Sequence, residues 1–349
     1  MNQLEMGGDT VGRSDLSLKK NYISLRLGGL SSTQMDNIIR IIDGVYDNRP
    51  AKILSTVMSS DAYTKLDSMV GCDAAKQTIK AMIAQSRMNT IIRLRNGCVS
   101  PSYYHAVFIG NPGCAKTTCA RLYAKILHEE GVTRNSRFAE LNRASLVGAY
   151  VGHTERNVKA VFEENAGGTI FIDEAYALCE DAENDSAYGT QAINEIIVEL
   201  ENRSDTVVIF AGYPDKMEKF LNSNPGLLSR IPYRVSFEDY SEGELVSISK
   251  MIAKDRGFEI SEQACQKMMS YFSIERRTEN FGNGRACRNL VDEAIRTKSL
   301  KLGVLDCKDL NVYADKARYT DEDLFTLSEA DFVFRNKQST KAYSRIGFC

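Results

Sequence analysis

The sequence predicts an α/β domain followed by a small helical domain. Between residues 61 and 238, five short β-rich runs alternate with helical stretches, and most of these runs are apolar. Apolar runs separated by helices favour a parallel sheet that is covered on both faces. From 239 to 302 the pattern is only helical, which predicts the second domain. The five runs are AVFIG (106–110), RFAEL (137–141), TIFID (169–173), TVVIFAG (206–212) and YRVSF (233–237).

Two further regions flank these domains. Residues 1–60 begin polar and then take on a helical pattern, since MDNIIRIIDGVYD has apolar residues at 38, 39, 41, 42 and 45. We expect a mostly helical N-terminal extension of unknown role. Residues 303–349 are expected to form a polar C-terminal tail, in which LFTLSEADF adds a last helix or a clasp.

Composition and charge narrow the class of protein. The 349 residues are 43% hydrophobic and 26% charged, as in a soluble globular protein, and the net charge is only −2. This balance argues against nucleic acid or an anionic membrane as the main partner. No run approaches the roughly 20 apolar residues of a membrane span, and the start lacks the apolar core of a signal peptide. Nine cysteines without a CxxC pair, and three scattered histidines, predict no disulfide framework or zinc site and favour a reducing cytoplasm.

The stretch GNPGCAKTT (110–118), here called the phosphate loop, lies between an expected strand and an expected helix. Phosphate-binding loops follow the pattern Gly, four residues, Gly-Lys-Ser/Thr, and Ala115 replaces the second glycine. Backbone N–H groups of such a loop hold phosphate oxygens, Lys116 would reach the β- and γ-phosphates, and Thr117 would ligate Mg²⁺. The alternative is an ordinary strand-to-helix turn that contains Gly and Lys. The candidate nucleotide-binding residues of the loop are Asn111, Pro112, Gly113, Cys114, Ala115, Lys116, Thr117 and Thr118.

A second motif, TIFIDEAYAL, places Asp173 and Glu174 at the end of an apolar strand. In a P-loop ATPase we expect such a strand to lie beside the strand of the phosphate loop. Asp173 would hold Mg²⁺, usually through water, and Glu174 would orient and polarise the attacking water. A solvated acid pair at a strand end is the alternative. Its position about 55 residues after the phosphate loop favours the catalytic interpretation.

Together the motifs resemble the AAA+ ATPases grouped with red-type Rubisco activase and stage V sporulation protein K. The resemblance runs from about residue 66 to 302. It implies an AAA+ P-loop ATPase core, with a five-stranded parallel sheet between helices, followed by a small α-helical lid. It also implies ATP and Mg²⁺ as cofactors, ATP hydrolysis, and assembly into a homo-oligomeric ring, expected to be a hexamer. The matching stretches are GNPGCAKTTCARLYAKIL, LVGAYVGHTE, GGTIFIDEAYAL, VVIFAGYPDKMEKFLNSNPGLLSRIPY and FGNGRACRNLVDEAI.

The resemblance also implies roles for single residues. Val70 and Gly71 match the segment that packs against adenine. Arg230 matches the arginine finger, which reaches a neighbouring subunit's nucleotide, and Arg285 matches the sensor-2 arginine of the lid. Tyr213 falls where many AAA+ proteins have a sensor-1 Asn. Either arginine could instead be a surface salt-bridge partner.

A loop with an aromatic residue lies between the second strand and the next helix. Tyr150, Val151 and Gly152 fit the aromatic–apolar–Gly pattern of the family's pore loop. An exposed aromatic side chain on such a loop can grip an extended peptide by contact area. The alternative places Tyr150 in the core, before the helix TERNVKAVFEE.

Two residues of the phosphate loop depart from the group's usual GTGKT. The methyl of Ala115 would come near the phosphate oxygens, but minichromosome maintenance helicases and some MoxR-type AAA+ proteins also have Ala there. With every other catalytic position present, we expect a functional loop. Cys114 stands where Thr is usual. A thiol at a helix N-terminus can have a lowered pKa, so oxidation of Cys114 could switch off nucleotide binding; the alternative is a small filler residue.

These features predict an ATP-binding and ATP-hydrolysing ring that remodels or threads a protein partner, whose identity is unknown. The alternative function is a nucleotide-dependent assembly switch or scaffold with little hydrolysis, which Ala115 and the unmatched first sixty residues favour. A DNA or RNA motor is a third class. The balanced charge and the lack of a basic run argue against it.

Overall fold

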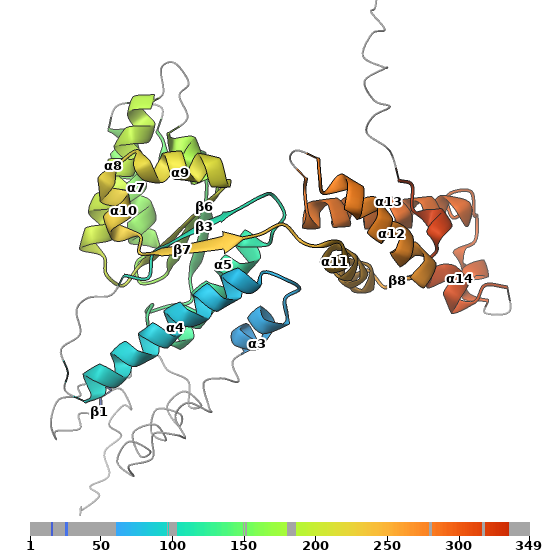
Figure 1. Ribbon diagram of the computed structural model, residues 1–349, viewed down its shortest axis with the longest axis horizontal. Coiled ribbons are helices and arrows are strands. Elements are labelled where there is room, and N and C mark those ends of the chain that lie inside the picture. The colour runs from blue at the N-terminus through green and yellow to red at the C-terminus, as the bar shows by residue number, and fades with distance from the viewer. Residues whose placement is uncertain are drawn as a thin grey trace, which may run out of the picture. The chain divides into compact units, whose positions relative to one another are not determined.

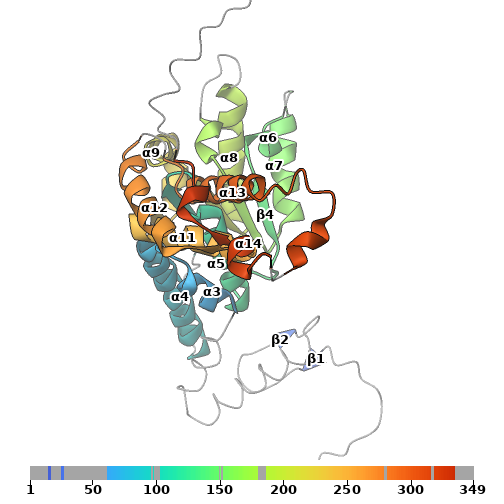
Figure 2. The ribbon, with the colours of Figure 1, turned by 90° about the vertical axis from the view of Figure 1, so that its right-hand side faces the viewer.

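The computed structural model describes residues 15–16, 25–26, 61–95, 97, 103–148, 150, 152–179, 186–278, 281–315 and 318–334. The chain divides into two units, Met1–Asp61 and Ala62–Cys349. In the first unit, β1 (Asp15–Leu16) pairs antiparallel with β2 (Leu25–Arg26), as Figure 2 shows. The helix expected around residues 35–47 lies outside the described residues.

The second unit contains the predicted five-stranded sheet, in which every pair of neighbouring strands is parallel. The strand order is β4-β5-β6-β3-β7. The expected neighbourhood of β3 and β5 is therefore wrong, because β6 lies between them. Their carboxyl ends still meet at one edge, since all the strands run the same way. The strands are β3 (Ala106–Gly110), β4 (Phe138–Leu141), β5 (Thr169–Ile172), β6 (Val207–Gly212) and β7 (Tyr233–Phe237).

Helices cover both faces of this sheet (Figure 1). Successive strand residues alternate between the faces, so Phe108 packs with Ile79 and Tyr123 while Val107 packs with Phe162 and other residues of the opposite core. One face carries α3 (Asp61–Ser68), α4 (Asp73–Leu94) and α5 (Lys116–Glu129). The other carries α6 (Arg143–Leu146), α7 (His153–Glu164), η1 (Ala175–Leu178), α8 (Ser186–Asn202), α9 (Pro214–Asn222) and α10 (Pro225–Arg230).

A helical domain follows β7 and has its own core. Its first helix begins with a capping box, in which Ser241 and Glu244 satisfy each other's backbone N–H groups. The segment after residue 302 belongs to this core, because Leu327 and Phe332 are buried in it. The elements are α11 (Glu242–Asp255), β8 (Glu259–Ile260), α12 (Glu262–Glu275), α13 (Gly284–Lys301), η2 (Leu310–Ala314), α14 (Asp321–Phe325), β9 (Thr326–Leu327) and η3 (Glu329–Asp331). The short strands β8 and β9 pair in parallel.

Candidate nucleotide-binding site

The phosphate loop connects β3 to α5 through two residues in the left-handed region. Gly113 has φ 75° and Ala115, which immediately precedes α5, has φ 62° and ψ 22°. Left-handed residues between right-handed ones turn successive N–H groups toward one concave side, which is the geometry of an anion site. The backbone conformation therefore fits phosphate binding.

The left-handed conformation of Ala115 strains its backbone, in addition to the space that its methyl group takes beside the phosphate. An L-residue other than glycine costs roughly 1 kcal/mol or more in the left-handed region. The second glycine of the usual pattern is thus explained by φ at least as much as by the approach of phosphate. The expected cost of Ala115 therefore comes from its backbone conformation as well as from its methyl group.

The loop forms one wall of a cavity of about 590 Å³. The other walls come from the segment before α4, the ends of β5 and β6, and helices α11 and α13. The predicted site residues that line the cavity are Val70, Pro112, Gly113, Ala115, Lys116, Thr117, Thr118, Asp173, Glu174, Tyr213 and Arg285. The lining residues that were not predicted include Met69, Tyr240 and Arg288. Gly71, Asn111, Cys114 and Arg230 are not among the lining residues.

Lys116 is the cation at the base of this cavity. Its Nζ donates hydrogen bonds to the carbonyl oxygens of Gly110 (2.7 Å) and Asn111 (2.8 Å). The ring of Tyr213 lies 5.8 Å from the same amine. Burial lowers the pKa of Lys116, so the charge costs free energy until an anion compensates it. Phosphate oxygens would supply that compensation, which supports the fit of a nucleotide to the cavity.

Two carboxylates face the cavity from the end of β5. Asp173 Oδ1 accepts a hydrogen bond from the N–H of Glu174 (3.0 Å), and Glu174 itself is left-handed, with φ 50°. Such a backbone is strained for Glu and is found most often at functional sites. Thr117 lines the same cavity. A hydroxyl and a carboxylate are the hard oxygen ligands that Mg²⁺ prefers, so the residues present also fit this ion.

The two predicted arginines occupy different places. Arg285 lies in the first turn of α13 and lines the cavity. Arg230 ends α10, where it forms an ion pair with Glu201 and donates a hydrogen bond to the carbonyl oxygen of Gly226 (3.0 Å). The structure therefore brings Arg285 to the cavity of its own subunit and leaves Arg230 outside it.

A polar network that the sequence does not predict links the phosphate loop to the helical domain. Asp239 accepts hydrogen bonds from the side-chain amides of Asn111 (3.0 Å to each carboxylate oxygen) and Asn283 (2.7 Å). The N–H of Gly284 donates to the carbonyl oxygen of Gly113 (3.2 Å). The partners lie far apart along the chain, so no local pattern could have indicated these bonds.

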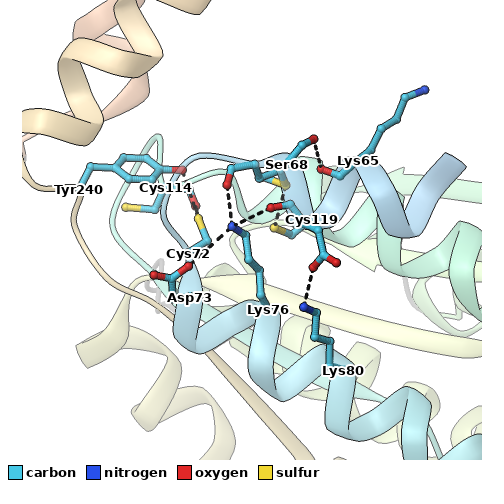
Figure 3. Close-up of polar contacts among 11 residues, drawn as sticks. Lys65, Ser68, Cys72, Asp73, Lys76, Lys80, Cys114, Cys119 and Tyr240 are labelled. Carbon is cyan, nitrogen blue, oxygen red and sulfur yellow. Dashed lines mark hydrogen bonds and ion pairs between the residues drawn. The ribbon is translucent and has the colours of Figure 1, made fainter. Parts of the chain in front are cut away.

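The hypothesis of a lowered pKa at Cys114 is wrong, whereas its buried side chain agrees with the alternative of a small filler residue. Burial, reinforced by the neighbouring carboxylate of Asp239, raises the pKa of its thiol to about 12. Figure 3 shows Cys72 between Cys114 and Tyr240, with its sulfur 3.2 Å from the Tyr240 hydroxyl. In this group a hydrogen bond with Cys119 lowers the pKa of Cys72 to about 7, although burial opposes the shift. The thiol with the lowered pKa is therefore Cys72, which lies before α4 and outside the phosphate loop.

Tyr150 lies at the surface of the protein, ahead of α7. The side chain of Tyr150 is 69% exposed, which excludes the interpretation as a core residue, and its ring lies edge-on to His153 at 5.3 Å. Gly152, with φ 80°, directly precedes α7. Val151 lies outside the described residues.

Two family models match the chain. The model described as "ATPase family associated with various cellular activities (AAA)" matches residues 106–237, and the model described as "AAA lid domain" matches residues 241–342. The first covers all five strands of the sheet. The second includes the segment after residue 302 that packs into the helical core.

Curated relatives are similar over most of their length. Stage V sporulation protein K of Bacillus subtilis is 33% identical over 282 residues, which are 80% of this chain and 84% of that protein. Protein CfxQ of Xanthobacter flavus is 38% identical over 240 residues, or 68% of this chain and 74% of that protein. The chloroplastic ribulose bisphosphate carboxylase/oxygenase activase of Cyanidioschyzon merolae is 37% identical over 229 residues, 65% and 77% of the two chains.

Solved structures agree on the fold. The AAA domain of FIGL-1 matches with a TM-score of 0.54 at 16% identity, covering 82% of this chain and 89% of that domain. The same domain in complex with ADP matches with a TM-score of 0.51 at 17% identity, covering 84% and 94%. At this level of identity the likeness is one of fold alone.

Proposed function

This chain belongs to the AAA family of ATPases, in the group of stage V sporulation protein K and the CfxQ proteins, and we propose that it is a ring-forming ATPase that remodels or threads a protein partner. The cavity supports the ATPase part of this proposal, because it gathers Lys116, Asp173, Glu174 and Arg285 on one nucleotide-sized space. The identity of the partner is left open. The rest of the proposal depends on Arg230 and Tyr150.

Within one subunit, the residues that line the cavity divide the proposed tasks of binding and hydrolysing ATP. Lys116 leaves the loop carbonyls and binds the phosphates, and Arg285 approaches from the helical domain. Thr117 and Asp173 would hold Mg²⁺, which neutralises phosphate charge when bound. Glu174 orients the attacking water and accepts its proton. Met69 and Val70 line the cavity ahead of α4, where they can cover the adenine.

The observation that supports a shared active site is the position of Arg230. Phosphoryl transfer gains from a cation that arrives only when the site is assembled. Arg230 does not line the cavity of its own subunit, and its ion pair with Glu201 holds it at the end of α10. We place it at the nucleotide of the neighbouring subunit in a homo-oligomeric ring, proposed to be a hexamer.

The ring is tested by measuring ATP turnover per subunit against protein concentration. For the wild type we expect turnover to rise with concentration as subunits assemble. Arg230→Ala is expected to stay at the low, dilute value, because assembled subunits then lack the incoming cation. Equal turnover of the two proteins at every concentration would contradict a shared site.

Contact with a protein partner is assigned to Tyr150. Its exposed ring can hold an extended chain without reading its sequence. Casein, a disordered polypeptide, serves as the probe, and it is expected to stimulate ATP turnover of the wild type. Tyr150→Ala should keep the unstimulated rate and lose the stimulation, while Tyr150→Phe should keep both. Stimulation that survives Tyr150→Ala would rule out this role.

A switch or scaffold with little hydrolysis is the second candidate, favoured by the left-handed conformation of Ala115. In that case ATP would bind and drive assembly, and Glu174→Gln would behave like the wild type. Measured turnover of the two proteins separates the candidates.

We also propose a cytoplasmic location and no nucleic-acid partner. The cysteines that the structure describes are all free thiols, which suits a reducing compartment. No helix among the described residues has the length and apolar character needed to cross a membrane. A fractionation experiment tests the location, and ATP turnover measured with and without DNA or RNA tests the partner.

A further inference from the structure

Asp239 occupies the junction between the two domains and carries no assigned role. It is the second residue after β7 and precedes the capping box that opens α11. One of its carboxylate oxygens accepts hydrogen bonds from Asn111, the residue after β3, and from Asn283, the residue before α13. One side chain thus joins the start of the phosphate loop to the start of the helix that carries Arg285.

Asn283 is held unusually firmly. It is fully buried, and its backbone has φ 44° and ψ −121°, a strained conformation for a residue other than glycine. Its side-chain oxygen accepts from the N–H of Tyr240 (3.1 Å), and its amide nitrogen donates to Asp239 and to the carbonyl oxygen of Pro112 (3.3 Å). A side chain with such partners fixes where α13 begins.

The phosphate loop and the start of α13 are also in direct contact. The N–H of Gly284 donates to the carbonyl oxygen of Gly113, and a Cβ at Gly113 would collide with the carbonyl oxygen of Gly282. Only glycine permits this approach. The loop therefore lies directly against the first turn of α13, where Arg285 is located.

The same loop residue, Asn111, connects Asp239 to the lysine that binds phosphate. Its carbonyl oxygen accepts a hydrogen bond from Lys116, and its side chain donates to Asp239. When Lys116 turns to a nucleotide, Asn111 loses one partner and keeps the other. Asp239 then holds Asn111 and Asn283 together through the change.

We propose that Asp239 is a positioning residue, which places Arg285 over the nucleotide by holding Asn283 against the phosphate loop. This inference deepens the proposed function and rests on it, since it requires that Arg285 contacts the bound nucleotide. A carboxylate suits the task because it accepts hydrogen bonds only, and its side-chain partners are all donors: the amides of Asn111 and Asn283 and the thiol of Cys114 (3.5 Å). In Asp239→Asn, an NH₂ group would face the NH₂ group of Asn111 or of Asn283.

The test is a double-mutant cycle on the dissociation constant for ATP, measured by fluorescence titration. The proteins are the wild type, Asp239→Asn, Arg285→Ala and the double variant. Asp239→Asn should raise the dissociation constant roughly tenfold in the wild-type background, because a bond to a charged acceptor is lost. In the Arg285→Ala background the same change should have an effect of less than about twofold, since the arginine to be positioned is absent.

The matched control is Glu238→Gln, which removes the same charge from the adjacent, exposed residue and should leave the dissociation constant unchanged. Equal effects of Asp239→Asn in both backgrounds, or no effect in the wild type, would overturn the inference. Melting temperatures of the four proteins are measured alongside, because a merely structural role would lower them without the dependence on Arg285. ATP binding by the wild type tests the proposed function separately.

Discussion

The α/β domain and the helical domain contribute to the same cavity in different ways. Lys116 follows β3, and Asp173 and Glu174 follow β5. Both strands pair with β6, so the backbone hydrogen bonds of one sheet hold these residues relative to one another. Arg285 comes from a domain with a separate core, and polar contacts around Asp239 and Asn283 join that domain to the phosphate loop. Backbone pairing in the sheet therefore positions the first three side chains, whereas the position of Arg285 depends on side-chain contacts between the two domains.

The largest expected effect concerns the groups held by the sheet. Glu174→Gln keeps the size of the side chain but removes the carboxylate that we propose as the base accepting a proton from water. We expect turnover to fall roughly 10²- to 10⁴-fold while ATP binding is retained. Phosphate release and ATP affinity measure the two effects. A variant that hydrolyses ATP at the wild-type rate would remove Glu174 from the mechanism.

The next prediction concerns the stability of the α/β domain in acid, which depends on a buried histidine. His105, before β3, is buried, and burial lowers its pKa to about 4 from an ordinary 6.5; its Nδ1 accepts the N–H of Val208 (3.0 Å). As the pH falls, the unfolded chain therefore binds a proton at His105 before the folded protein does. The contribution of His105 to the free energy of unfolding is intact above pH 6.5 and is lost as the pH falls toward 4. The loss from this group is roughly 3 kcal/mol.

Urea unfolding at several pH values checks this loss. His105→Asn keeps an acceptor for Val208 and has no group that titrates, so it should lose about 3 kcal/mol less than the wild type between pH 7 and pH 4. All three histidines of the chain precede residue 160, so the effect belongs to the α/β domain. Identical pH profiles of the two proteins would contradict a neutral, buried His105.

The smallest expected effect is at Ala115. Ala115→Gly relieves the left-handed strain and should stabilise the protein by about 1 kcal/mol. Ala124→Gly, in the middle of α5, is the matched control and should destabilise it by at least about 1 kcal/mol, because glycine is a poor helix former and Ala124 is buried. Thermal melting measures both. Changes of the same sign would mean that φ at Ala115 carries no cost.

The sequence was sufficient for the elements with local signals. All five strand runs were predicted because apolar stretches bounded by turns depend only on neighbouring residues, and the AAA fold followed from their motifs. The expectation that β5 lies beside β3 was wrong, since β6 separates the two strands. Pairing between strands is a non-local property that the motif spacing does not encode.

The remaining differences have the same physical origin. The pKa of Cys114 depends on burial and on Asp239, which lies 125 positions away in the chain. The left-handed conformation of Ala115 is indicated only by the glycine that the usual pattern has at this position, and the alanine of this chain removes that local signal. Leu327 and Phe332 looked like part of a polar tail because the core that buries them is built from distant helices.

The most direct test of the account mixes two inactive variants. Lys116→Ala retains Arg230 but lacks the phosphate-binding cation, and Arg230→Ala retains Lys116 but lacks the arginine. If the active site is shared between subunits, mixed rings contain sites with both groups, roughly a quarter of the total when equal amounts of the two variants mix at random. We therefore predict that ATP turnover reappears on mixing. A mixture that assembles and stays as inactive as its components would contradict the shared site.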